Sequence, residues 1–180
     1  MRTYLALSFA AAALAVLPGC AAEAPPDAAA LAPHTDAQPS EQDKAWLAAI
    51  HQGNLAEVQA GRLARNKGVT KQIKAVGEML VKDHTKLDTK VTQTATQLGV
   101  TLPTSPTAGQ RTELLRLENA TGQDFDQDFL GGMIKAHKEA IAATKKEIST
   151  GSSPAVVALA KTAAPSLQEH LSALRRAQGE

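Results

Sequence analysis

Residues 71 to 98 read KQIKAVGEMLVKDHTKLDTKVTQTATQL, and their pattern is the clearest indication of the fold. Spacings of three and four residues alternate along one set of its positions, namely Ile73, Gly77, Leu80, His84, Leu87, Val91, Thr94 and Leu98. Positions spaced in this way lie on one face of an α-helix, and here the alternation continues for nearly four heptads. We therefore expect one long helix with an inward-facing stripe, with Thr70 as its N-cap and Gly99 just after its end.

Prolines mark where the other helices can run. The chain has no proline between Pro39 and Pro103 or between Pro106 and Pro154, and proline is rarely tolerated inside a helix. The apolar periodicity predicts four long helices and a short one between the second and third of them. Their expected ranges are 41–67, 71–98, 110–120 for the short helix, 124–150 and 154–178.

The connections between these helices predict an all-α fold. Short loops at residues 68–69 and 151–153 would join the long helices into two antiparallel hairpins, which together form a four-helix bundle over residues 40–178. The link between the hairpins, residues 99–123, is long enough to run along the bundle. That course would give a ferritin-like topology with a short helix in the crossover. A simple up-down order with a free end loop is the alternative.

Composition excludes several classes of protein. After residue 39 the chain has only three aromatic residues, and it is rich in alanine, which favours helices over a β-sandwich or barrel. Cys20 is the single cysteine, so an internal disulfide and a multi-cysteine zinc site are excluded. A net charge of +1 argues against a general nucleic-acid binder. No nucleophile, paired-carboxylate site or cofactor motif points to an enzyme.

The N-terminus has the form of an export signal. It begins with Met1-Arg2, which is positively charged, and residues 4–17 are apolar apart from Ser8. This apolar run is too short to span a membrane but suits a secretory signal. The run closes on Leu17-Pro18-Gly19-Cys20, which resembles a bacterial lipobox.

The lipobox predicts where the protein sits. We expect residues 1–19 to be a lipoprotein signal peptide and residues 20–39, which are rich in alanine and proline, to be a disordered tether. A lipid on Cys20 would anchor the protein to a membrane on the periplasmic or cell-surface side of the envelope. Ala21 after the cysteine favours the outer membrane in a Gram-negative host. Ordinary signal cleavage after Ala24, which would give a soluble protein, is the alternative.

Histidine is the one residue type whose placement indicates chemistry. Four histidines fall one per long helix, each on the inward stripe: His51, His84, His137 and His170. Within each hairpin the two histidines are separated by 33 residues. Because His51 and His84 lie at nearly equal distances from the turn at Gly68, we expect them to face each other. His137 and His170 are matched less closely about Gly151.

Four inward-facing imidazoles predict either a metal site or a buried polar network. Helix bundles hold metals on side chains from facing helices, and imidazole suits zinc, copper, nickel or iron. Oxygen ligands could come from Glu57 and from Asp83 or Asp88. These residues could instead form hydrogen bonds to the histidines from outside the metal site. In the alternative, each histidine is bonded to polar neighbours such as Asn54 and has a structural role only. Another small ligand or a response to pH is a third interpretation.

Several short motifs resemble those of a known family. In the first hairpin they are Asn54-x-x-Glu57-Val58-x-x-Gly61-x-Leu63-Ala64 and Met79-x-Val81-x-Asp83-His84. In the second they are Phe125-Asp126, the later His137, and Pro165-x-Leu167-x-x-His170-Leu171. Their order and spacing are similar to the domain of unknown function family 4142.

This resemblance implies a ferritin-like bundle in a bacterial exported protein, with the crossover topology rather than the up-down order. It implies no particular activity. Ferritin-like di-iron proteins carry Glu-x-x-His on two helices, and this chain has no such motif. It has Asp83-His84 and Glu169-His170 instead, and neighbours on a helix do not face the same way. Di-iron ferroxidase or oxygenase chemistry is therefore not expected.

Overall fold

A computed structural model of the protein describes residues 38–179. This part of the chain contains helices and loops but no strands, which confirms the all-α prediction. The helices are α1 (Glu41–Lys67), α2 (Lys71–Gln97), α3 (Ala108–Asn119), α4 (Gly122–Thr150) and α5 (Pro154–Gln178). None of them is long and apolar enough to cross a membrane. The expected signal segment, Cys20 and most of the tether lie outside the described residues.

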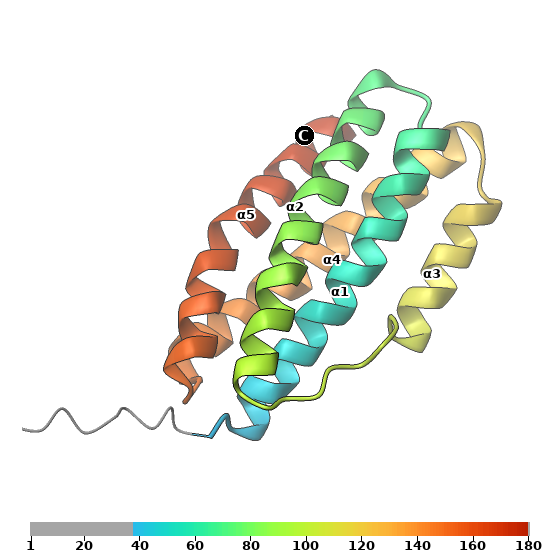
Figure 1. Cartoon of the computed structure of the whole chain (residues 1–180). Helices are drawn as coiled ribbons and strands as arrows, with labels where there is room; N and C mark the ends of the chain where they lie inside the picture. Colours follow the sequence, from blue (N-terminus) through green and yellow to red (C-terminus); the bar gives the residue numbers. More distant parts are fainter. Residues whose placement is uncertain (1–37, 180) are drawn as a thin grey trace, which may run out of the picture. The chain divides into compact units, whose positions relative to one another are not determined.

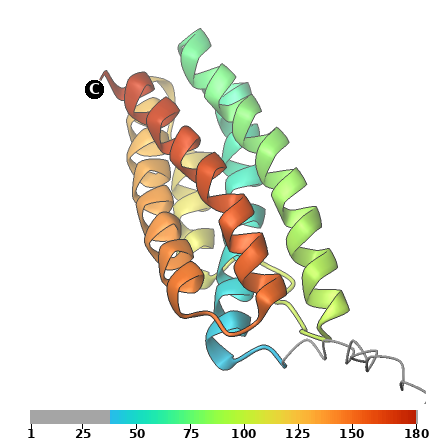
Figure 2. The ribbon, with the colours of Figure 1, turned by 90° about the vertical axis from the view of Figure 1, so that its left-hand side faces the viewer.

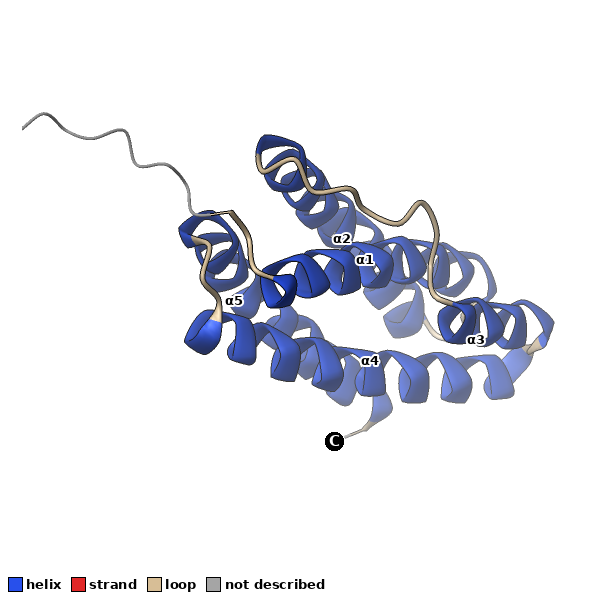
Figure 3. Cartoon of the chain, turned by 90° about the horizontal axis from the view of Figure 1, so that it is seen from below, coloured by secondary structure: helices blue, strands red, loops and turns tan. Residues whose placement is uncertain are grey.

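The four long helices pack side by side as a helical bundle. α1 runs antiparallel to α2, and α4 runs antiparallel to α5 (Figure 1). α1 also packs on α4 and α2 on α5, so that α5 is flanked by α4 and α2 (Figure 2). The connection after α2 returns along the outside of the bundle and contains α3, which lies against α1 and α4 (Figure 3).

Local capping explains where the helices begin. Ser40 and Thr70 accept hydrogen bonds from the backbone N–H three residues later, as helix N-caps do, and α1 has the predicted bounds 41–67. The short helix α3 begins two residues earlier than predicted. There Thr107 and Gln110 form a capping box, each side chain accepting from the other residue's backbone N–H.

A close approach of two glycines fixes how α1 and α2 pack. A Cβ atom on Gly61 would lie 2.7 Å from the carbonyl oxygen of Gly77, and one on Gly77 would lie 2.6 Å from the carbonyl oxygen of Gly61. Only glycine allows two helix backbones to come this close. Both residues are eight positions from Val69, so the hairpin is centred on that residue.

A buried carboxyl pair joins the start of α1 to the turn between α4 and α5. The side chain of Asp43 accepts hydrogen bonds from the backbone N–H of Ser152 at 3.0 Å and of Ser153 at 3.2 Å. Burial opposes ionisation of Asp43, but the hydrogen bonds from Ser152 and Ser40 outweigh it and hold the pKa well below the ordinary value. Burial, together with the neighbouring Asp43, raises the pKa of Glu147 to about 7. Glu147 is therefore protonated in the folded protein under mildly acidic conditions.

Glu147 makes the stability of the fold depend on pH. Because its pKa is raised from 4.5 to about 7, the folded chain binds more protons than the unfolded chain in this range, and stability falls as pH rises through it. Glutamine does not ionise, so replacing Glu147 by glutamine removes this dependence of stability on pH. We expect Glu147→Gln to gain about 2 kcal/mol relative to wild type between about pH 5 and pH 8. Urea unfolding at the two pH values measures this, and identical pH profiles for both proteins would contradict it.

Candidate metal centre

A layer of polar side chains interrupts the hydrophobic core halfway along the bundle. On one side of it lies an apolar cluster that includes Leu80 and Phe129, and on the other a cluster that includes Trp46 and Leu167. On each long helix a buried polar residue falls between the two clusters. These residues are Asn54 and Glu57 on α1, His84 on α2, His137 on α4 and His170 on α5. Burying polar groups is unfavourable unless each finds a partner, so the layer requires an explanation.

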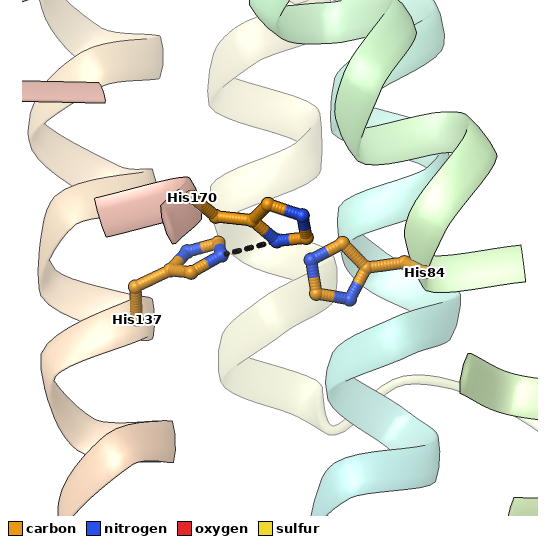
Figure 4. Close-up of side chains that lie close together, drawn as sticks. All are labelled: His84, His137 and His170. Atoms are coloured by element: carbon orange, nitrogen blue, oxygen red, sulfur yellow. Dashed lines mark hydrogen bonds between the residues drawn. The ribbon is translucent and has the colours of Figure 1, made fainter. Parts of the chain in front are cut away.

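Three of the histidines converge at the centre of this layer. The ring centroids of His84, His137 and His170 are 5.0 to 5.5 Å apart. One nitrogen from each ring lies within 4.8 Å of the others. Figure 4 shows the rings arriving from three different helices, with a nitrogen of His84 directed toward the other two. All three residues are buried.

The outer nitrogen of each ring faces a hydrogen-bond acceptor. His84 Nδ1 lies 2.9 Å from Asn54 Oδ1, and His137 Nδ1 lies 3.0 Å from the backbone carbonyl oxygen of Met133. His170 Nε2 lies 3.2 Å from a carboxylate oxygen of Asp83. Since these oxygens can only accept, each outer nitrogen carries the proton and donates it. When such a ring is neutral, its inner nitrogen presents a lone pair.

These lone pairs point at one another. His137 Nε2 lies 3.4 Å from His170 Nδ1, and a hydrogen bond between them needs an extra proton on one ring. Burial lowers the pKa of both histidines, that of His170 to about 4, so neither ring holds that proton at neutral pH. Two acceptors then face each other without a donor.

Glu57 adds a carboxylate to the same point. Its Oε2 lies 2.6 Å from His84 Nε2 and 3.7 Å from His137 Nε2. Both Glu57 Oε2 and His84 Nε2 are buried without a hydrogen-bond partner, because the geometry of their contact is not that of a hydrogen bond. Burial raises the pKa of Glu57, but positive charge on the surrounding imidazoles, His84 first, lowers it to about 2, so an ionised Glu57 requires a positive charge beside it. The centre is therefore an ionised carboxylate among three imidazoles.

This donor set fits a transition-metal ion. Three imidazole nitrogens and one carboxylate oxygen are ligands that zinc, copper and iron accept. Two nitrogens at 2.0–2.1 Å from a tetrahedral ion are about 3.3 Å apart, and His137 and His170 already have this separation at 3.4 Å. Metal-bound histidines also donate their outer N–H to a carbonyl or carboxylate, as His137 and His170 do here. An ion would require Glu57 and His84 to separate by roughly 0.7 Å.

The other residues predicted for the site lie outside its centre. His51 Nδ1 pairs with Asp88 Oδ1 at 2.7 Å, and His51 is not among the three histidines that converge. Asp83 contacts the outer nitrogen of His170, so it would orient that ring rather than bind an ion itself. Asp88 also accepts a hydrogen bond from Asn54 Nδ2 at 3.3 Å. Through Asn54, Asp88 supports His84 from outside.

The hairpin turns explain these differences from the expected pairing. The prediction that His51 faces His84 assumed a hairpin centred near Gly68. With the centre on Val69, the residue opposite His84 is Asn54, which contacts it. His51 then lies opposite a point one helical turn further along α2, where it contacts Asp88. In the second hairpin, α5 begins at Pro154, so the centre of the hairpin lies after Gly151 in the sequence. With this register His137 and His170 come together.

The fold and the site together define a helical-bundle protein with three histidines and a glutamate gathered in its core. The chain belongs to the family described as "Domain of unknown function (DUF4142)", whose sequence model matches residues 28–177. The resemblance expected from the sequence motifs is thereby confirmed. No curated protein and no solved structure gives a significant match to the chain.

Proposed function

We propose that this protein binds one transition-metal ion, zinc, copper or iron, through His84, His137, His170 and Glu57. Three imidazole nitrogens and one carboxylate oxygen, all buried, face one point in the core, and this arrangement supports the proposal. A positive ion at that point satisfies all four acceptors at once. Such an ion also removes the repulsion between the facing lone pairs and the carboxylate.

A purely structural polar network is the alternative, and the hydrogen-bond directions disfavour it. In a network that stabilises a core, each acceptor meets a donor. Here the three ring N–H groups are already used by Asn54, the carbonyl of Met133 and Asp83, all on the outer side. A network would therefore need an additional ring proton at the centre.

The proposed assignment of the fold is a ferritin-like bundle with one ion rather than two. The pairing of α1 with α2 and of α4 with α5, and the long connection that contains α3, support it. Di-iron proteins of this fold use a glutamate from each of two helices and Glu-x-x-His from the other two. Since the chain lacks Glu-x-x-His and Glu57 is the carboxylate that meets the inner nitrogens, a mononuclear site is the better fit.

We further propose that the protein is exported and held at a membrane of the cell envelope by a lipid on Cys20. The apolar N-terminal run that ends in Leu17-Pro18-Gly19-Cys20 supports this. We expect Cys20→Ser to move the protein from the membrane fraction to the soluble fraction. Unchanged fractionation of Cys20→Ser would reject the lipid anchor without affecting the metal proposal.

Calorimetric titration of the untagged, metal-free protein tests metal binding. We expect one Zn²⁺ or Cu²⁺ per chain, and a loss of affinity of at least about 100-fold in His84→Ala, because a ligand is removed from the centre. His51→Ala is the matched control, since it removes a buried histidine of the neighbouring helix that pairs with Asp88 instead. We expect it to bind within about threefold of wild type. Equal loss in both variants, or no binding by wild type, would contradict the proposal.

A further inference from the structure

Two adjoining cavities lie in the groove between α1 and α4. The outer one, of about 560 Å³, is bounded by α1, α4 and the crossover helix α3. The inner one, of about 210 Å³, has His84 and Glu57 in its wall. The two cavities share Gly53, Glu57 and Ala136 among their lining residues. Together they form a path from the outer side of the bundle to one side of the proposed metal site.

Small residues keep this path open. A Cβ atom added to Gly53, Gly131 or Gly132 would meet nothing within 4 Å, so no neighbour requires glycine there. All three lie inside helices, where glycine is less favourable than alanine by about 0.5–1 kcal/mol. Larger side chains at these positions would extend into the cavities that the glycines line.

The inner cavity ends on polar atoms that lack partners. Glu57 Oε2 and His84 Nε2, which lie 2.6 Å from each other, are buried without a hydrogen bond and belong to residues in its wall. The rest of this wall is largely apolar. We propose that this groove is a binding pocket through which a small monovalent anion reaches and coordinates the metal ion. The inference rests on the proposed metal site. A metal site with such a pocket is open and can exchange a bound anion, unlike a closed structural metal site.

Charge balance identifies the class of ligand. A divalent ion held by neutral imidazoles and the single carboxylate of Glu57 keeps one uncompensated positive charge, and burying such a charge is strongly unfavourable. Nearby acidic groups compensate it little. Asp83 lies on the far side of His170 with a side chain 37% exposed to solvent, and Asp88 is already paired with His51. Glu139 lines both cavities but is exposed to solvent, which screens its charge. A small anion in the inner cavity supplies the missing charge.

The size of the inner cavity sets an upper limit on the ligand. Its volume is about 210 Å³. An anion of a few heavy atoms fits beside the ion within this volume. The outer cavity, under α3, provides the route and holds no part of the metal site except Glu57.

Azide binding to the Cu²⁺-loaded protein tests the inference. We expect azide to change the visible absorption spectrum with saturation at one azide per chain. Gly53→Leu fills the shared part of the two cavities and replaces no metal ligand, so we expect the apparent Kd for azide to rise at least about tenfold at unchanged copper content. Ala142→Leu, an equivalent enlargement at an exposed position of α4, is the control and should behave as wild type.

A second measurement needs no metal. Trp46, the single tryptophan of the chain, lines the inner cavity and is buried. We expect acrylamide to quench its fluorescence in the wild-type and Ala142→Leu proteins and to quench it at least about twofold less in Gly53→Leu.

The possible outcomes separate the two proposals. Copper binding without any azide response, or an azide affinity in Gly53→Leu equal to that of wild type, would overturn the open pocket and leave the metal site standing. Failure of the wild-type protein to bind copper would overturn both. Equal quenching of Trp46 in all three proteins would show that the groove is not the route.

Discussion

Saturating metal is expected to raise the free energy of unfolding of the wild-type protein by about 4 kcal/mol when free metal is 1,000 times the Kd. The four ligands come from α1, α2, α4 and α5 and meet only in the folded chain. His137→Ala removes the ligand at the centre of the group, and we expect its stability to be unchanged by metal. Urea unfolding with and without Zn²⁺, followed by the fluorescence of Trp46, measures the difference.

A comparison with His51→Ala makes this result specific. That variant also loses a buried histidine, but His51 pairs with Asp88 and does not reach the centre. We expect it to keep the whole stabilisation by metal, although its own stability without metal falls. If metal stabilised His137→Ala as much as wild type, the ion would have to bind elsewhere on the chain.

We expect Gly77→Ala to lower the free energy of unfolding by about 1–3 kcal/mol, because the added methyl group overpacks the contact between α1 and α2. The added methyl group would lie 2.6 Å from the carbonyl oxygen of Gly61 and 2.8 Å from the Cβ of Ala64, so α1 and α2 must move apart. Chemical denaturation compares the variant with wild type. Because Asn54 and Glu57 reach His84 across the same pair of helices, we also expect weaker metal binding.

Gly131→Ala is the matched control for this variant. It introduces the same methyl group at a glycine inside a long helix, but nothing lies within 4 Å of the new atom. We expect it to raise stability by about 0.5–1 kcal/mol, since alanine favours the helix. Equal stability of Gly77→Ala and Gly131→Ala would show that the glycine contact does not hold the register of α1 and α2.

Most of the helical architecture could be predicted from the sequence, because helices are encoded locally. The spacing of Ile73, Leu80 and Val91 predicts the buried face of α2, and all three are buried. The start of α3 was missed by two residues. The capping box between Thr107 and Gln110 was present in the sequence and could have placed it correctly.

The composition of the site was harder to predict, because it depends on contacts between helices. The stripes correctly place four histidines inside, and His84, His137 and His170 do converge. Which of the four meet is decided by the register of each hairpin. A shift of the turn centre from Gly68 to Val69 is enough to separate His51 from His84.

One supporting group of the site gives no signal in a sequence. The acceptor for His137 is the backbone carbonyl of Met133, one turn earlier on the same helix. Every residue has such a carbonyl, so only the ring orientation in the fold identifies it. Asp83 and Asn54, by contrast, carry polar side chains near the stripe and could be named in advance as partners of the histidines.

X-ray absorption at the metal edge of the loaded, untagged protein gives the number and type of atoms bound to the ion. We expect three imidazole nitrogens, from His84, His137 and His170, and an oxygen from Glu57, each at about 2.0–2.2 Å. A coordination shell with one imidazole or none, or one that is unchanged in His137→Ala, would contradict this expectation.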